Sequence, residues 1–428
     1  MSRHDKWLHG EIAQWRSEGV IEQELAAVLA ARYPITDKEW SRIIFSVLGA
    51  VLLGLGVILF FAYNWENLPK FAKLGLIFAA LLGSHGAALW SARHTAAPAS
   101  LVEGLHILGV MLFGAGIWLV AQIYHIDEHY PNAFLFWSLG ALSLAWALPS
   151  LAQGFLAVLL IALWSAFDVF DFHWTNHWAP LLIACGIVPL AWMQRSRLLL
   201  FFALLALLLL LVWGVVPLDD DLIIAVAMFI SVSYIFAGLL VSETAFAESH
   251  TIFKLMGFTG YFIFLYVLSF AKASKGLDNV NFSRVVIMLY FAVPLALAVL
   301  GCFWVLLTRL GRLDRLWQWQ WALIIIPLLL VAGMSLELLP LGGSAAILFN
   351  LVFLAHCVLF IVQGSRDVDA KLVSIACVLF ALLTITRYVD LFDSLLLRSL
   401  VFLLLGAGVF VVGNFYSRTK RRIGEAGV

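Results

Sequence analysis

Long apolar runs separated by short polar breaks repeat along almost the whole chain. The clearest run covers residues 198–216, which carry no polar side chain except one Trp indole and lie between Arg197 and Asp219. A helix rises about 1.5 Å per residue, so roughly 20 apolar residues cross the hydrocarbon core of a bilayer. The run predicts a transmembrane helix, and its repetition predicts an all-α, polytopic transmembrane helix bundle.

The polar breaks divide the chain into about 14 candidate spans. Their predicted limits, in chain order, are 43–63, 74–92, 101–124, 133–148, 151–167, 178–193, 198–216, 222–241, 252–271, 285–307, 321–339, 345–362, 372–387 and 395–416. The fourth to sixth spans are short, so a re-entrant pair or one tilted hairpin is an alternative to full crossings there. The predicted organisation is a cytoplasmic hairpin over residues 1–42, a helix bundle over 43–417 and a basic cytoplasmic tail over 418–428.

The N-terminal segment carries two amphipathic patterns in place of an apolar run. Apolar residues recur at helical spacing from Trp7 to Trp15 and again from Leu25 to Tyr33, with Gly19 between the two stretches. A glycine in that place favours a helix end, so the pattern predicts a short helical hairpin. The hairpin either lies against the membrane face or the bundle, or it docks a partner protein.

The composition is typical of a membrane protein and limits the kinds of partner that it can be expected to bind. Hydrophobic residues make up 63% of the 428 residues and charged residues 12%, against about 25% charged residues in soluble proteins. The formal net charge is zero, so a nucleic-acid partner is not expected. The expected partner is the lipid bilayer, with a membrane-protein partner or a homo-oligomer as alternatives, and no cofactor is expected. The cysteines lack the spacing of a zinc site and predict packed thiols: Cys185, Cys302, Cys357 and Cys377.

Lys and Arg residues fall unequally on the two sides of the membrane that the spans imply. With the N-terminus inside, 19 of the 26 lie on the cytoplasmic side, including the cluster from Arg418 to Arg422, and seven lie outside. Positively charged loops stay in the cytoplasm. The distribution therefore predicts that both termini are cytoplasmic.

The third span carries the densest set of polar side chains inside an apolar run. At 100° per residue its polar and small residues fall close to one line, with Gly114 and Ala121 in the middle. A charge at the centre of a span costs roughly 2.5–3.5 kcal/mol. We therefore expect one of two arrangements. Either this face of the helix borders a solvated path or a proton relay, or its polar side chains lie near the membrane interfaces, where polar groups cost little. The candidate pathway residues are Glu103, His106, Gln122, Tyr124 and His125, together with His85 of the second span.

His85 is the most central histidine of this set. It is expected to pair with Glu103 or His106 across the helix interface, or to bond a backbone carbonyl. Gly83 and Ala87, four residues apart in the same span, predict close helix packing. The polar residues of the later spans look isolated, among them His356.

Two predicted outer loops concentrate histidine and carboxylate side chains. One contains His125 and His129, and the other contains Asp171, His173 and His177. Two histidines four residues apart can bind one metal ion if the segment is helical. Acidic outer loops also arise simply as the complement of positively charged inner loops, so no metal site is expected, and the second loop supplies weak candidates only.

Two motifs in the first third of the chain resemble a known family. The stretch 60–73, FFAYNWENLPKFAK, and the stretch 114–125, GAGIWLVAQIYH, resemble the bacterial membrane-protein family catalogued as domain of unknown function 2157. The resemblance covers roughly residues 7–150 and marks Asn64 and Trp65 as family-motif residues. That family has no agreed activity, so the resemblance implies a prokaryotic inner-membrane protein and little about its chemistry.

Three classes of function remain open. A carrier or flippase-like protein for a small or lipid-linked solute is favoured by the span number and by the polar face of the third span. A structural or assembly subunit of a membrane complex is the first alternative, because deeply buried charges are scarce. A membrane-embedded enzyme acting at the outer face is the second, although no catalytic motif is present and no catalytic residue is expected.

Overall fold

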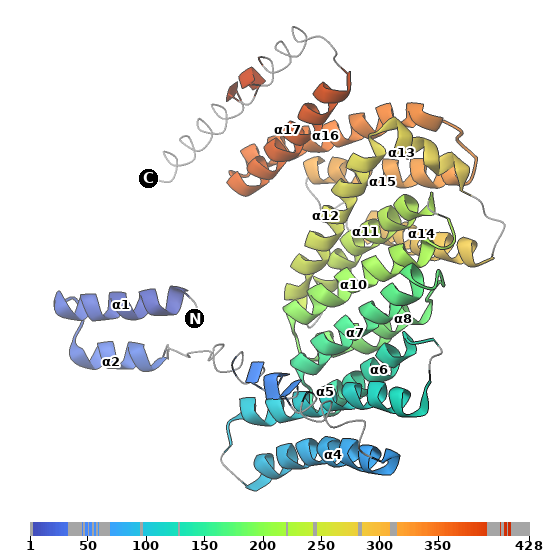
Figure 1. Cartoon of the computed structure of the whole chain (residues 1–428). Helices are drawn as coiled ribbons and strands as arrows, with labels where there is room; N and C mark the ends of the chain where they lie inside the picture. Colours follow the sequence, from blue (N-terminus) through green and yellow to red (C-terminus); the bar gives the residue numbers. More distant parts are fainter. Residues whose placement is uncertain are drawn as a thin grey trace. The chain divides into compact units, whose positions relative to one another are not determined.

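The structure is a computed structural model, and every regular element in its described residues is helical. It describes residues 3–32, 69–94, 97–126, 129–219, 221–242, 246–280, 285–308 and 315–391, with single positions between 45 and 59 and between 403 and 411. The helices form two compact units, Met1–Glu128 and His129–Val428. Figure 1 shows the helices of each unit.

The first unit begins with the predicted helical hairpin. Helix α1 (Arg3–Ser17) and helix α2 (Gln23–Arg32) pack together through buried Ile12 and Ala26. Between them Gly19 adopts a φ of 71°, and the amide of Val20 donates to the carbonyl of Trp15 at 2.9 Å. This is the usual glycine-terminated helix end. The prediction of a hairpin punctuated by Gly19 is confirmed.

A second hairpin of longer helices completes the described part of this unit. Helices α4 (Lys70–His94) and α5 (Ala99–Tyr124) contact each other along their length. A Cβ added to Gly109 would lie 2.5 Å from the His85 ring, and one added to Gly116 would lie 2.8 Å from Ile77. The glycines of α5 therefore bring the two helices together. A Cβ added to Gly83 meets nothing within 4 Å among the described residues, so the contact between α4 and α5 does not use this glycine.

The second unit contains the remaining helices. Nine described helices of the chain are long and apolar enough to cross a membrane, and three shorter apolar segments cover residues 132–147, 178–193 and 290–304. These twelve correspond to the second to thirteenth predicted spans, while the first and last predicted spans lie mostly outside the described residues. The longer elements of this unit are α6 (Asn132–Ala147), α7 (Leu151–Phe170), α10 (Arg197–Val215), α11 (Leu222–Val241), α12 (His250–Leu268), α14 (Val285–Thr308), α15 (Arg315–Ser335), α16 (Ala345–Arg366) and α17 (Ala370–Leu391). The shorter ones are α8 (Trp178–Leu182), η2 (Ile183–Ile187), α9 (Val188–Met193), η3 (Ala247–Ser249), α13 (Ala271–Gly276), η4 (Leu277–Asn279) and η6 (Gly342–Ser344).

The predicted sixth span is one continuous helical segment that contains a π-helical turn. Helices α8 and α9 are joined by the π-helical turn η2, and Pro189 is the second residue of α9. Proline has no N–H to donate to the preceding turn, and the indole Nε1 of Trp146 from α6 donates to the carbonyl of Gly186 at 2.9 Å. This contact gives the carbonyl of Gly186, within the π-helical turn, a side-chain donor.

Helix α11 is the most buried element and packs against α10, α12, α14 and α15. Figure 1 shows α10, α11 and α12 side by side. A Cβ added to Gly257 of α12 would lie 2.6 Å from the amide of Ile235 and 2.8 Å from the carbonyl of Ser231. The backbones of α11 and α12 are therefore almost in contact, which is the packing that small residues allow between membrane helices.

Candidate functional site

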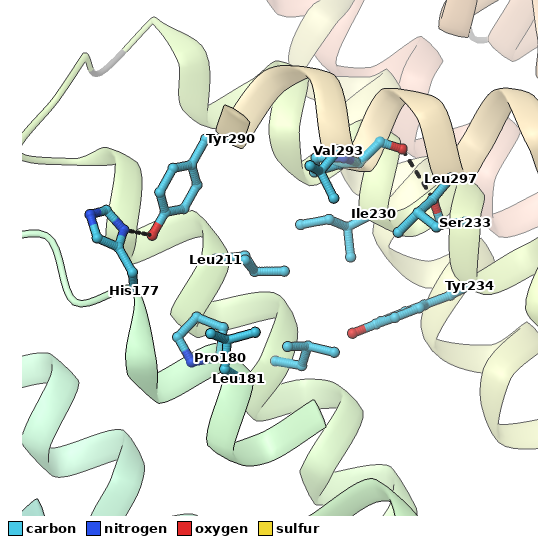
Figure 2. A pocket seen from close by; sticks show the side chains of 12 residues that line it. His177, Pro180, Leu181, Leu211, Ile230, Ser233, Tyr234, Tyr290, Val293 and Leu297 are labelled. Atoms are coloured by element: carbon cyan, nitrogen blue, oxygen red, sulfur yellow. Dashed lines mark hydrogen bonds between the residues drawn. The ribbon is translucent and has the colours of Figure 1, made fainter. Parts of the chain in front are cut away.

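A cavity of about 450 Å³ lies between α8, α10, α11 and α14 (Figure 2). Its walls are almost entirely aliphatic, with proline rings from α8 and α14 and a few hydroxyl and imidazole groups. The lining residues are His177, Pro180, Leu181, Leu207, Leu211, Ile230, Ser233, Tyr234, Tyr290, Val293, Pro294 and Leu297. Its volume lies within the range of about 300–1,000 Å³ that is typical of small-molecule sites.

At one end of this cavity two hydrogen-bonding side chains face each other, as Figure 2 shows. The Nδ1 atom of His177, just before α8, lies 3.1 Å from the hydroxyl of Tyr290 on α14. Burial lowers the pKa of His177 below its usual value, so its ring is neutral at pH 7 and offers a donor and an acceptor. A Cβ added to Gly214 would lie 2.6 Å from the Tyr290 hydroxyl, so this glycine leaves the space that the tyrosine occupies.

The rest of the cavity is lined mainly by apolar side chains, and the two hydroxyls there already donate to backbone carbonyls. The hydroxyl of Ser233 donates to the carbonyl of Phe229 at 2.8 Å, and the hydroxyl of Tyr234 donates to the carbonyl of Leu204 at 2.9 Å. On α14 the lining continues from Tyr290 to Leu297, seven residues or about 10 Å further along the helix. The site therefore combines a long hydrocarbon wall with a polar pair, His177 and Tyr290, at one end and two hydroxyls at the other.

A second polar cluster joins the two loops in which the sequence concentrates histidine and carboxylate. Nε2 of His129, before α6, lies 2.5 Å from Oδ1 of Asp168 at the end of α7. The amide Nδ2 of Asn176 donates to the other carboxylate oxygen at 2.6 Å. The carbonyl Oδ1 of Asn176 in turn accepts from the amide of Ala179 at 3.0 Å, at the start of α8. The cluster thus ties the loop after α7 to α6 and to α8.

Aromatic rings cover this cluster and leave the carboxylate little exposed. The ring of His129 stacks on Trp174 with centroids 4.6 Å apart, and the side chain of Asp168 is 8% exposed. Nearby, the hydroxyl of Tyr130 donates to Asp171, whose carboxylate raises the pKa of Tyr130. Both oxygens of Asp168 are occupied, so the His129–Asp168 pair is arranged as a structural clamp more than as a reacting group.

The three weak metal candidates do not come together. Asp171 accepts the hydroxyl of Tyr130, while His177 lies against Tyr290 in the cavity described above. Residues 173–176 are not helical, so the spacing of His173 and His177 does not place their rings on one face. Across the described ranges, no three His, Cys, Asp or Glu side chains are placed to share a metal ion.

The α4–α5 hairpin brings together two of the candidate pathway residues. The Nδ1 atoms of His85 and His106 lie 3.0 Å apart, which is the pairing expected across this interface. One ring must carry its hydrogen on Nδ1 and the other must not, so the contact is incompatible with two protonated rings. His106 is buried, and Glu103 one turn away is half-buried.

The other end of α5 is exposed. Gln122, Tyr124 and His125 are exposed within the first unit, and His125 ends the helix with a φ of 53°. Gly114, in the middle of the predicted polar line, is buried. The helix therefore separates the candidate pathway residues into a buried pair and an exposed end. The family-motif residues Asn64 and Trp65 lie outside the described residues.

One buried polar network was not predicted from the sequence. Nε2 of His356 on α16 lies 2.8 Å from the hydroxyl of Tyr261 on α12, and its Nδ1 lies 2.6 Å from Oε1 of Gln320 on α15. All three residues are buried. The interpretation of His356 as an isolated polar residue is wrong, because the sequence does not reveal which helices are neighbours. Cys185 is exposed and not packed, while Cys302 and Cys357 are buried.

Residues 13–154 match the model of a family described as "Predicted membrane protein (DUF2157)". This confirms the resemblance found in the first third of the sequence. No curated protein and no solved structure shows significant similarity to the chain. The helices and this family match together identify the chain as a polytopic membrane protein. The cavity and most of the polar residues described in the second unit lie after the matched segment.

Proposed function

We propose that this chain is a carrier or flippase-like protein for a lipid-linked solute, in the cytoplasmic membrane of a prokaryote. The observation that supports the proposal is the cavity between α8, α10, α11 and α14, which combines an aliphatic wall with the His177–Tyr290 pair at one end. A flippase needs a place for a hydrocarbon tail and a separate place for a polar head. This cavity offers both in one site.

The polar end of the cavity favours a head group that exchanges hydrogen bonds. A neutral His177 and the Tyr290 hydroxyl can each donate or accept, and neither carries a charge at pH 7. For the first unit, taken by itself, we propose that the exposed residues Gln122, Tyr124 and His125 of α5 line a polar path, and that the buried His85–His106 contact holds α4 and α5 together.

The alternatives predict different behaviour. An assembly subunit would hold lipid in this cavity as a structural filler without moving it. An enzyme would place its chemistry at His129 and Asp168, yet both carboxylate oxygens already have partners. The carrier proposal is preferred because the cavity has room for a small molecule and is lined by both aliphatic and polar side chains.

Photolabelling tests whether the cavity binds lipid. A phosphatidylcholine analogue with a diazirine in its acyl chain is expected to label peptides of α10 and α14 in the protein reconstituted in vesicles. Leu211→Trp, which fills the cavity, should abolish that labelling, whereas Leu209→Trp on the same helix, which does not line the cavity, should not. Equal labelling in the two variants would refute binding in the cavity.

A second assay separates carrying from binding. In proteoliposomes containing lipids with a fluorescent head group, a membrane-impermeant reductant bleaches only the outer leaflet, so a flippase raises the bleached fraction above one half. We expect this rise in the wild type and its loss in Leu211→Trp and Tyr290→Phe. Labelling without any rise would leave lipid binding intact and favour the assembly-subunit alternative.

A further inference from the structure

The floor and the rim of the cavity described above come from different helices. At the floor, Ile230 and Tyr234 of α11 are only 4% and 7% exposed. Three other lining residues are 51%, 53% and 56% exposed: Leu181 of α8 and Val293 and Leu297 of α14. Because these side chains both line the cavity and are exposed, the cavity opens to its surroundings between α8 and α14. Figure 2 shows the labelled residues of these two helices with the cavity between them.

The face that α14 turns to the cavity has a buried edge and an exposed edge. Its four lining residues follow the spacing i, i+3, i+4 and i+7, which places them on one side of a helix. Tyr290 and Pro294 are buried and form the inner edge of this face. Val293 and Leu297 are exposed and form its outer edge. On α8 the buried Pro180 and the exposed residue that follows it show the same division.

The outer edge of this face lies in the middle of its helix. Leu297 is about 17 Å from either end of the 24-residue helix α14 at 1.5 Å per residue. The hydrocarbon core of a bilayer is about 30 Å thick, so the middle of a helix that crosses it is surrounded by acyl chains. The opening between α8 and α14 therefore faces hydrocarbon and not water.

The side chains at the opening fit hydrocarbon better than water or a charged solute. No Lys, Arg, Asp or Glu lines the cavity in the described part of the chain. An ordered water needs about two to four polar partners, and the three exposed rim residues are all aliphatic. A charged group in this opening would lose its hydration without gaining a partner of opposite charge.

The two sides of the opening are joined at one end by the polar pair. The Nδ1 atom of His177 lies 3.1 Å from the hydroxyl of Tyr290. Leu181 follows His177 by four residues, and Val293 and Leu297 follow Tyr290 by three and seven. Both helices thus run away from the pair toward the exposed rim. Away from the pair they are held by different neighbours, since α8 packs against α7 and α10 and α14 packs mainly against α11.

We propose that the opening between α8 and α14 is a lateral portal, through which a membrane lipid passes an acyl chain from the bilayer into the cavity. The chain crosses the rim between Leu181 and Leu297 and lies against Leu211 of α10, while the head group stays beside the polar pair. This inference rests on the lipid site of the proposed function. It does not rest on transport, because a lipid that is only bound also needs a way in.

Electron paramagnetic resonance of a spin label inside the cavity tests where the cavity opens. The label is attached to Leu211→Cys in the full-length protein without native cysteines, reconstituted in phosphatidylcholine vesicles. We expect frequent collisions with molecular oxygen, which dissolves in hydrocarbon, and few with a water-soluble nickel chelate. Preference for the nickel chelate would show an opening to water. Protection from both reagents would show a rim covered by protein, such as a second copy of the chain. Either result would overturn the portal.

Variants of the rim assign the opening to α8 and α14. Leu297→Trp narrows the rim, so it should reduce both the oxygen collisions of the label and, in the protein with Leu211 intact, the photolabelling of α10. Leu300→Trp is the matched control, since Leu300 is 63% exposed on the same helix and does not line the cavity. Leu181→Trp should act like Leu297→Trp from the α8 side, which keeps the test valid if one rim variant fails to fold. Equal effects of Leu297→Trp and Leu300→Trp would exclude a portal between these helices.

The same measurements separate the portal from the carrier. Photolabelling that is lost in Leu297→Trp, in a protein whose wild type does not flip lipids, would support the portal and refute only the transport. Flipping that continues unchanged in both rim variants would overturn the portal and leave the carrier proposal in place. Absence of photolabelling in the wild type would overturn the portal together with the lipid site.

Discussion

Gly257 illustrates how much a single residue contributes where two backbones meet. A methyl group there would lie 2.6 Å from the Ile235 amide, and backbone atoms cannot move aside as a flexible side chain can. We expect Gly257→Ala to destabilise the protein by about 1–3 kcal/mol, measured as a lower unfolding temperature in detergent. Gly83→Ala, where a Cβ meets nothing within 4 Å, is the control and should unfold at the wild-type temperature or slightly above it. Equal losses in both variants would contradict the packing described for α11 and α12.

Asp168 should matter more to stability than its neighbour Asp171. In Asp168→Asn one carboxylate oxygen becomes an NH₂ group that faces the donor of either His129 or Asn176. Leaving a buried group mispaired costs about 1–3 kcal/mol, and we expect a corresponding fall in unfolding temperature. Asp171→Asn changes a carboxylate that is exposed and bound to Tyr130, so its effect should stay within about 0.5 kcal/mol. The reverse order of the two variants would refute the clamp.

His177 should make stability depend on pH. Its pKa in the folded protein is lowered by burial, so the unfolded chain binds the proton more tightly. Stability is unaffected by this group above the ordinary histidine pKa of about 6.5 and falls as the pH drops from there toward the lowered folded value. Unfolding temperatures measured between pH 7.5 and pH 5 should therefore decline less steeply in His177→Gln than in the wild type. Parallel pH profiles would show that the imidazole does not titrate in this way.

The sequence allowed only some of these side-chain contacts to be predicted. Gly19 and the His85–His106 pair were predictable because each depends on neighbours close in the sequence or on adjacent spans. The network of Tyr261, Gln320 and His356 was not, since its members come from three helices far apart along the chain. Hydropathy identifies which segments lie in the membrane, but not which of them touch.

At the scale of elements, α5 is where the predicted pathway and the structure can be compared. Its middle is buried at His106 and Gly114, and its end is exposed at Gln122 and Tyr124. In a variant without the native cysteines, we expect a cysteine at position 122 to react with a membrane-impermeant thiol reagent and one at position 114 to stay protected. A thiol in a dry, packed environment keeps its proton and meets no reagent. Strong labelling at 114 would instead indicate a solvated path along the whole helix.

The short fourth to sixth spans differ from one another in a way that hydropathy does not show. Helix α7 has 20 residues and can cross a bilayer, whereas α6 has only 16. The third of them contains a π-helical turn at residues 183–187 within an otherwise α-helical segment. Their positions were predictable from the apolar runs, but the π-helical turn was not, because Pro180 and Pro189 mark where a helix can break without specifying the turn that results.

At the scale of the whole molecule, we expect 14 crossings with both termini in the cytoplasm. The reason is the excess of Lys and Arg in the loops assigned to that side. Alkaline phosphatase fused after Val428, or inserted in the loop at Gln194, should be inactive, while a fusion in the loop at Asp219 should be active. Activity at either of the first two positions would reverse or break the topology.

The matched family segment ends at residue 154, whereas His177, Tyr290 and Leu297 line the cavity further along the chain. The family match therefore does not include the side chains that line the cavity. Relatives with the same substrate should be grouped by the side chains at these three later positions, and a chimera that exchanges residues 1–154 should keep the lipid preference of its C-terminal donor.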